Sequence, residues 1–197
     1  MSVSDRTSGP EGTAPRARLS SGLAESLRRA PQTLPWHAVL AASLSGGLTI
    51  AVLGLCGDVV RTPILIAAFG SSCVLVFLLP DAALSKPVNV VGGHLVSAVC
   101  GLLAHTVLPV AWWSLGLAVG VAMAAMAVLR VVHPPAGGTP IAIMLGQAGW
   151  GYLLTPVLAG ALILSACALA YRVALHRVAA RRARAACAGA TPPSVAD

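Results

Sequence analysis

The sequence has very little charge, and most of that charge lies near its two ends. Charged residues make up 10% of the 197 residues, against about 25% in soluble globular domains. Between residues 36 and 170 only five occur, namely Asp58, Arg61, Asp81, Lys86 and Arg130. A water-soluble fold of this length needs a far more polar surface, so a soluble globular domain is excluded.

Several functional signatures are also missing. The five cysteines form no CxxC pair and no Cys/His pair with metal-ligand spacing, so we expect neither a metal site nor a disulfide framework. There is no GxSxG, HExxH or phosphate-binding loop motif, so we expect no enzyme activity and no cofactor. An intramembrane hydrolase is a third hypothesis. Its nucleophile and base would come from Ser71, Ser72 or Ser97 and from His94 or His133.

What the sequence does contain is long apolar segments. Its hydrophobic fraction is 57% and its mean hydropathy is +0.84. The apolar segments run over residues 36–56, 62–79, 89–108, 112–132, 138–146 and 153–173. We predict an all-α, polytopic membrane helix bundle of about six hydrophobic segments, some broken or re-entrant. The segment 138–146 is too short to span as a helix, which needs about 20 residues.

Charge at the ends predicts the orientation. The net charge of +7 comes mainly from arginines near the termini, and basic residues next to spans favour the cytoplasmic side. Nucleic-acid binding is the alternative, and it requires more assumptions. We predict a disordered basic tail at 1–35, a transmembrane domain at 36–175 and a basic tail at 176–197.

Both termini then lie in the cytoplasm, and the number of crossings is even. Six crossings, which we favour, place residues 81–86 and Arg130 inside and residues 106–113 outside, with Arg61 as one exception. Four full spans plus two shallow segments are the alternative. The expected location is a cell inner (plasma) membrane. A plastid membrane is the alternative, because the leader is basic and contains serine.

The chain contains a weak internal repeat. Residues 58–63 (DVVRTP) resemble residues 130–135 (RVVHPP), and each is followed by a glycine/hydroxyl cluster. Farther on, a glycine and a cysteine recur seven residues apart, at 93 and 100 and again at 160 and 167. Two three-span halves of one chain lie in opposite orientations, so we expect a 3+3 inverted repeat as in transporters. Chance similarity of small apolar residues is the alternative.

The segment 130–140 combines a cation, an imidazole, three prolines and two glycines. We expect no regular helix through it. Irregular backbone at membrane depth is tolerated only where it is buried in protein or lines a cavity. The N–H groups of Gly137, Gly138 and Thr139 are therefore candidate anion ligands at a helix start. A buried turn used only for packing is the alternative.

A second set of donors, Gly70, Ser71 and Ser72, comes from the other half of the chain. Two helix starts that converge in this way suit a small anion. Positive charge would come from one of three nearby residues, Arg61, Arg130 or His133.

His94 lies a third of the way along its segment, after two glycines that allow close helix approach. It is a candidate to line a pathway or relay protons. One hydrogen bond to a neighbouring helix is the alternative. Asn89 flanks the start of the same segment and is a further candidate ligand.

Three ordered motifs resemble those of the HPP family of integral membrane proteins. They are FGSS at 69–72, KPVNVVGGHL at 86–95 and HPPAGGT at 133–139. The likeness covers roughly residues 37–175. It implies a small multi-span protein, often counted as four spans, and plastid and cyanobacterial members are associated with nitrite transport. This sequence has Val88 where family members often carry a basic residue.

The resemblance and the motifs together predict a membrane transporter or channel for a small inorganic anion, with nitrite as the best candidate. The alternative is a non-transporting membrane scaffold or sensor. The expected partners are the lipid bilayer, the anion and, in a homo-oligomer, further copies of the chain. No nucleic acid is expected.

Overall fold

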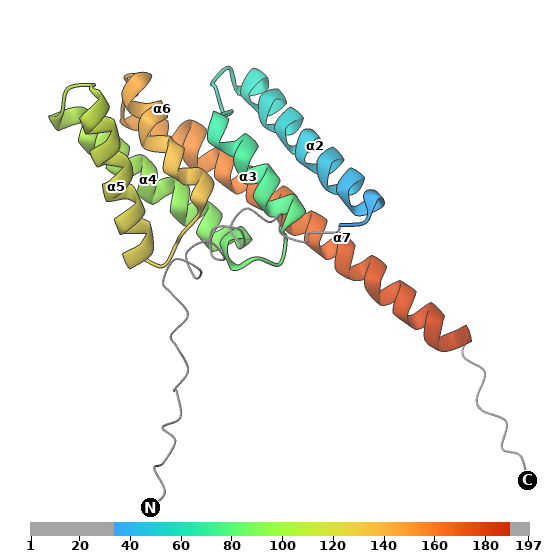
Figure 1. Ribbon diagram of the computed structural model, residues 1–197. Coiled ribbons are helices and arrows are strands. Elements are labelled where there is room, and N and C mark those ends of the chain that lie inside the picture. The colour runs from blue at the N-terminus through green and yellow to red at the C-terminus, as the bar shows by residue number, and fades with distance from the viewer. Residues whose placement is uncertain (1–33, 190–197) are drawn as a thin grey trace, which may run out of the picture. The chain divides into compact units, whose positions relative to one another are not determined.

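The computed structural model describes residues 34–189, which form six α-helices and no strand. The helices are α2 (Trp36–Val60), α3 (Ala67–Leu78), α4 (Pro87–Val107), α5 (Trp112–Val128), α6 (Thr139–Leu145) and α7 (Ala159–Gly189), as Figure 1 shows. Short helical turns precede three of the helices: η1 (Ala83–Ser85) precedes α4, η2 (Pro134–Gly138) precedes α6, and η3 (Trp150–Leu153) and η4 (Leu154–Leu158) precede α7. The predicted all-α bundle of six segments is confirmed.

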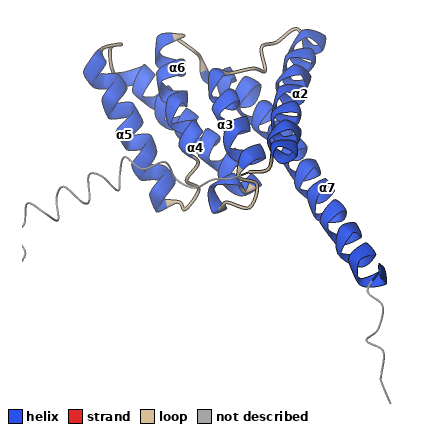
Figure 2. Cartoon of the chain, turned by 45° about the vertical axis from the view of Figure 1, so that its right-hand side comes forward, coloured by secondary structure: helices blue, strands red, loops and turns tan. Residues whose placement is uncertain are grey.

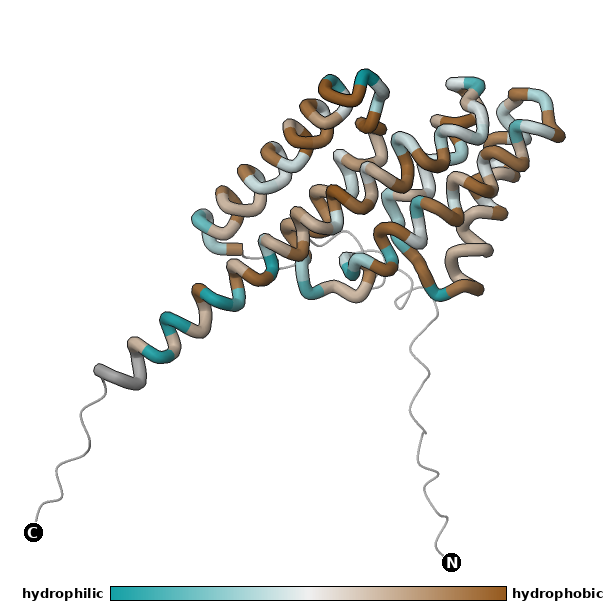
Figure 3. Tube along the Cα trace, turned by 180° about the vertical axis from the view of Figure 1, so that it is seen from behind, coloured by the Kyte–Doolittle hydropathy of each residue, from teal (hydrophilic) through white to brown (hydrophobic). Residues whose placement is uncertain are grey.

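The outside of the bundle is apolar. Three helical stretches are long and apolar enough to cross a membrane: Trp36–Val60, Pro87–Val107 and the composite Trp150–Ala185. Large hydrophobic side chains are exposed along the helices, for example Leu44 and Leu48 on α2. Figure 3 shows apolar residues over the length of the helices, while polar residues gather at the turns and the last turns of α7. Such a surface requires lipid around it, so this is a membrane protein.

Two of the six hydrophobic segments are interrupted, and they are called the broken crossings below. α3 has 12 residues, or about 18 Å of helix, which is shorter than the hydrocarbon core of about 30 Å. An extended stretch, 62–66, leads into α3, and another, 131–133, leads into η2 and α6. Each of these crossings is therefore part extended and part helical. Each begins at an arginine with left-handed backbone, Arg61 (φ 52°) and Arg130 (φ 58°).

The first break lies elsewhere than the sequence suggested. Gly70, Ser71 and Ser72 lie inside α3, after its first turn, and the interruption precedes them at 61–66. A helix accommodates one glycine at modest cost, whereas Pro63 cannot continue α2. The second break lies where it was predicted. Its backbone is extended up to His133, then 3₁₀ from Pro134 and α-helical from Thr139.

Glycine contacts relate the two broken crossings by a repeat of 67 residues. A Cβ on Gly93 of α4 would lie 3.0 Å from the carbonyl oxygen of Val131. A Cβ on Gly160 of α7 would lie 3.0 Å from the carbonyl oxygen of Ile64. Both the glycines and their partners are 67 residues apart. Each half of the chain thus packs a glycine against the extended stretch of the other half, as an inverted repeat requires.

The register of this repeat corrects part of the prediction. The hexapeptides 58–63 and 130–135 match at a spacing of 72 residues and are not the structural equivalents. The glycine/hydroxyl clusters and the Gly/Cys pairs match at 67. In Figures 1 and 2, α3 and α6 run in opposite directions along the bundle.

The connections alternate between the two ends of the bundle. The α3–α4 and α5–α6 connections lie at one end, and the α2–α3, α4–α5 and α6–α7 connections lie at the other (Figures 1 and 2). α7 ends beyond the first group of connections. At that end Arg172 of α7 lies 3.9 Å from the Asp81 carboxylate.

The ends of the chain differ in how far the structure describes them. Residues 1–33 and 190–197 lie outside the described part, and with them almost all of the predicted N-terminal tail. Residues 176–189, which the sequence assigned to a basic tail, continue α7 as helix. Alanine and arginine are both strong helix formers, which accounts for the extension.

Candidate functional site

Four polar side chains meet in the centre of the bundle. They are Ser72 of α3, His94 of α4, His133 just before η2, and Thr139 at the start of α6, and all four are 0% exposed. The Ser72 Oγ lies 3.1 Å from His94 Nε2 and 2.9 Å from His133 Nε2. His94 Nδ1 lies 3.3 Å from Thr139 Oγ1. These residues are called the central cluster below.

Glycine on α4 makes this cluster possible. A Cβ on Gly93 would lie 2.7 Å from the Cβ of His133, and a Cβ on Gly101 would lie 2.7 Å from the Cα of Pro140. Only glycine at these two positions lets the broken crossing lie directly on α4. Pro134 keeps the preceding His133 extended (φ −136°, ψ 100°). The sequence HPP therefore places the imidazole before the helix, pointing toward α3.

The ring of His94 is also held from a second side. The Phe69 ring packs edge-on against it, with ring centroids 5.1 Å apart and planes at 74°. A Cβ on Gly160 would touch the same phenyl ring. α7 thus presses Phe69 onto His94, which fixes the orientation of the imidazole in the absence of a carboxylate partner.

One arrangement of hydrogens pairs both imidazoles when the cluster is neutral. The carbonyl oxygen of Leu84, which can only accept, lies 3.0 Å from His133 Nδ1, so this nitrogen carries the hydrogen. His133 Nε2 then accepts from the Ser72 hydroxyl at 2.9 Å, and the Ala68 carbonyl is a second acceptor, 3.0 Å from the same hydroxyl. Ser72 in turn accepts from His94 Nε2–H, and His94 Nδ1 accepts from Thr139. One continuous chain of donors therefore leads from Thr139 to Leu84.

The cluster can also hold one extra proton while its four contacts stay hydrogen-bonded, and the Thr139 hydroxyl hydrogen then no longer donates to His94. In that state His133 donates from both nitrogens, Ser72 donates to His94 Nε2, and His94 Nδ1–H points at Thr139. A second extra proton is disfavoured because the two imidazole centroids are 5.3 Å apart. Two unit charges at that distance repel by about 3 kcal/mol at an effective dielectric constant of about 20.

Further hydrogen bonds hold the surrounding backbone, and sequence reasoning did not identify them. Ser97 Oγ donates to the Ala136 carbonyl at 2.6 Å, which ties η2 to α4. Asn89 Nδ2 donates to the Ala83 carbonyl at 2.9 Å and so anchors the turn that presents Leu84. The spacing of four between Gly93, Ser97 and Gly101 was the signal, since it places small residues on one helix face.

Several predicted ligands lie away from the cluster. Arg61 and Arg130 are exposed at opposite ends of the bundle. Gly70 and Ser71 are exposed on the far side of α3, and the Ser71 hydroxyl donates to the Ala68 carbonyl. Gly138 is exposed and Gly137 is half-buried. The last members of the two glycine/hydroxyl clusters, Ser72 and Thr139, are linked through His94, and the link is made by side chains, not by backbone N–H groups.

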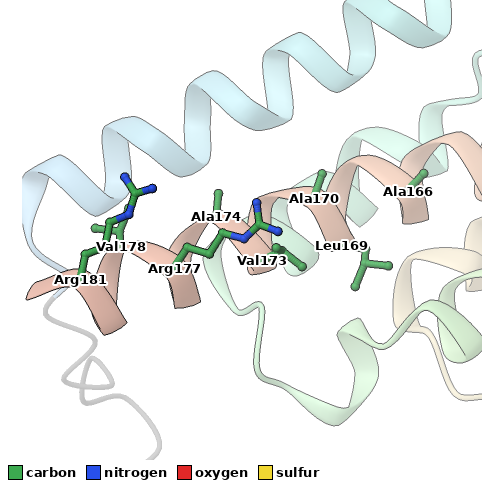
Figure 4. Close-up of a pocket in the computed structure, with 8 residues that line it drawn as sticks. All are labelled: Ala166, Leu169, Ala170, Val173, Ala174, Arg177, Val178 and Arg181. Carbon is green, nitrogen blue, oxygen red and sulfur yellow. The ribbon is translucent and has the colours of Figure 1, made fainter. Parts of the chain in front are cut away.

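Two grooves of the described residues lie outside the centre. A groove of about 600 Å³ follows α7 from Ala166 to Arg181 (Figure 4). It joins an apolar strip to the guanidinium groups of Arg177 and Arg181. A second groove, of about 500 Å³, lies at the α2–α3 turn and includes Arg61. At the centre the polar groups fill the space with their own hydrogen bonds.

Comparison with known proteins agrees with this architecture. A family model described as "HPP, transmembrane region" matches residues 31–181. Two transmembrane proteins of Dictyostelium discoideum are similar: one is 32% identical over 114 residues, covering 54% of this chain and 40% of the relative. The other is 33% identical over 117 residues, covering 55% of this chain and 38% of the relative. The chain thus spans about two fifths of the length of these relatives. No solved structure matches.

Proposed function

Because the chain belongs to the HPP transmembrane family, we propose that it carries a small inorganic anion across a membrane, with nitrite as the first candidate. The observation that supports this most is the central cluster. Four polar side chains with no exposure to solvent lie where two broken crossings of opposite direction meet. Polar groups at membrane depth are expensive and are usually functional.

The depth of the cluster fits a transport site. His94 is the eighth residue of α4, which places it about 10 Å from the start of that helix. The hydrocarbon core is about 30 Å thick, so the imidazole lies well inside it. Transporters built from inverted repeats bind their substrates near the midplane, at the interface of the two halves.

The cluster supplies what a small anion requires. Thr139 and Ser72 offer hydroxyl donors, and one extra proton turns the imidazole pair into a cation. A hydrogen bond between a cationic donor and an anion is about twice as strong as a neutral one. The side chains are close together, so the anion must be small. Val88, at the start of α4, is exposed and carries no charge. The selection of the anion therefore depends on the central cluster and not on this position.

The closed packing favours a carrier over an open pore. Ser72, His94, His133 and Thr139 occupy one another's hydrogen-bonding positions, so an anion enters only when α3 moves relative to α4 and α6. The extended stretch 62–66, which leads into α3, is a natural place for that movement because it has no helical hydrogen bonds of its own.

Orientation follows from the charges. We infer that both termini face the cytoplasm and that the membrane is the cell inner membrane. Arg177, Arg181, Arg182 and Arg184 lie on the part of α7 that extends past the α3–α4 connection. Arg130 and Lys86 lie at the same end of the bundle, as the positive-inside rule requires.

Purified protein in liposomes tests the function. Uptake of nitrite, nitrate, formate and chloride is measured against protein-free liposomes. We expect uptake of at least one of these anions. Thr139→Val should reduce it at least about tenfold, because the variant removes one hydrogen bond to a charged group, worth about 1.5–3 kcal/mol. Thr106→Val is the matched control, since Thr106 is exposed and bonds only within α4.

If none of the four anions moves, the carrier proposal fails. A scaffold or sensor role then predicts that His133→Ala leaves growth on nitrite unchanged while capture of partner proteins suffers. The Ser72–His133 distance of 2.9 Å also suits a nucleophile and its base. Labelling of Ser72 by a serine-reactive probe would favour the intramembrane hydrolase instead.

A further inference from the structure

We propose that the central cluster takes up one proton with each anion, so that transport is an electroneutral symport of anion and proton. This rests on the proposed anion transport and adds its coupling. The argument uses the donor chain from Thr139 to Leu84, the spacing of the two imidazoles, and the absence of an equivalent chain in the other half of the repeat.

The proton is taken up without loss of any hydrogen bond. It binds His94 Nδ1, which in the neutral cluster accepts from Thr139. The hydrogen on His94 Nε2 passes to Ser72 Oγ across 3.1 Å, and the Ser72 hydrogen passes to His133 Nε2 across 2.9 Å. One N–H bond forms at each end and each intermediate bond is replaced. The positive charge ends on His133, whose Nδ1–H still donates to Leu84.

This rearrangement prepares the anion site. After the transfer, His94 Nδ1–H is a donor, and Thr139 lies 3.3 Å from that nitrogen. An anion that replaces the Thr139 oxygen accepts from His94 and still reaches the threonine hydroxyl. Its charge is balanced by His133 through Ser72. The imidazole centroids are 5.3 Å apart, so a second proton is repelled and the loaded cluster is neutral.

The chain serves only one half of the protein. The repeat of 67 residues pairs His94 with Ala161 and His133 with Ile66. Both of these counterparts are buried and apolar. The titratable chain therefore leads from the centre to the end that carries Leu84, and the route to the opposite end has none. In the proposal, the proton therefore enters the cluster at His94 Nδ1 together with the anion, and this shared entry couples the two.

No other charged group competes for the proton within hydrogen-bonding distance of either imidazole among residues 34–189. α3 presents Phe69 and Ser72, and the thiol of the next residue, Cys73, faces α2 beside Gly46. The α3–α4 connection presents the Leu84 carbonyl, while its charged members Asp81 and Lys86 are exposed.

The remaining neighbours are neutral as well. α6 presents Thr139, and α7 presents Gly160 and Ala161 at this level. Arg130, the cation closest along the chain to His133, is exposed. The two imidazoles are therefore the groups on which the pH dependence of transport rests.

Proteoliposomes that contain a pH-sensitive dye test the coupling. The anion found to move in the uptake assay is added outside, and anion and proton uptake are recorded together. We expect a ratio of one to one. A potential set with potassium and valinomycin should leave the initial rate unchanged. A tenfold proton gradient, acid outside, should drive about tenfold accumulation above the protein-free background, as one-to-one coupling requires.

A glutamine substitution at His133 provides the second test of the coupling. His133→Gln keeps a polar side chain of similar reach but cannot be protonated, so it should lower proton-coupled anion uptake at least tenfold. Thr106→Val should leave it unchanged. Anion uptake without proton uptake, or a rate that follows the membrane potential, overturns the coupling while anion transport stands. A His133→Gln protein that retains both fluxes also overturns it. If no anion moves in any arm, the proposed function itself is wrong.

Discussion

Gly93→Ala is the most direct test of how the central cluster is held. The added Cβ would lie 2.7 Å from the Cβ of His133 and 3.0 Å from the Val131 carbonyl oxygen. Carbon atoms in ordinary contact are about 3.5–4.0 Å apart, so the extended stretch must move by about 1 Å. The Ser72–His133 hydrogen bond is 2.9 Å long, and N/O hydrogen bonds weaken beyond about 3.2 Å. We therefore expect it to break.

The magnitude follows from two opposing terms. Overpacking of a buried site costs about 1–3 kcal/mol, whereas replacing glycine by alanine within a helix gains up to about 1 kcal/mol. Gly120→Ala isolates the second term, because Gly120 is exposed on α5 and a Cβ there meets nothing within 4 Å. The two variants should differ by about 2 kcal/mol. For a protein of this size that is about 4–8 °C in melting temperature.

The assay is thermal unfolding of both purified variants in the same mild detergent, followed by anion uptake in liposomes. Gly93→Ala should melt below Gly120→Ala and lose most of its uptake, while Gly120→Ala keeps it. If the two proteins melt together, the close approach of the broken crossing to α4 is not what holds the cluster, and the reasoning from glycine contacts is refuted.

Three further predictions follow from the same geometry. Gly160→Ala should lower the melting temperature about as much as Gly93→Ala, because it meets the Ile64 carbonyl in the equivalent way; an unchanged melting temperature would contradict the repeat. Ser97→Ala should cost about 0.5–1.5 kcal/mol of stability, because it removes one of two donors to the Ala136 carbonyl, the other being the Thr139 N–H, and denaturant titration measures this. Cysteines placed at Arg61 and Arg130 should react with a membrane-impermeant maleimide from opposite sides; labelling from the same side would refute the predicted alternation.

The sequence predicts the helices well where length and hydropathy decide them. The predicted segments 36–56 and 89–108 correspond to α2 and α4, because long apolar runs of this kind have few alternatives in a membrane. The first broken crossing was placed too late. The sequence predicts the break at Gly70-Ser71-Ser72, yet Pro63 is the residue that cannot continue a helix. The predicted basic tail, 176–197, begins as a continuation of α7 to Gly189, because alanine and arginine favour helix.

The sequence marks the members of the central cluster as candidates but does not give their arrangement. His94, His133, Ser72 and Thr139 were all named, since each is a polar residue in an apolar segment. Their contact could not be derived, because it depends on how closely the crossing approaches α4, and a one-dimensional pattern does not give that distance. Backbone N–H groups were expected to face the centre, and the structure places the side chains there. The hydropathy pattern does not show whether backbone N–H groups or side chains face the centre.

The exchanged glycine contacts also bear on how the chain becomes complete during synthesis. Ile64 and Phe69 pack against Gly160 of the last helix, and Gly93 packs against Val131 and His133, which follow α5. A nascent chain that ends after α4 has therefore inserted three helices whose contacts with the second half have not yet formed. The final helix packs against both halves of the chain, so truncation within it should destabilise the first half as well as the second.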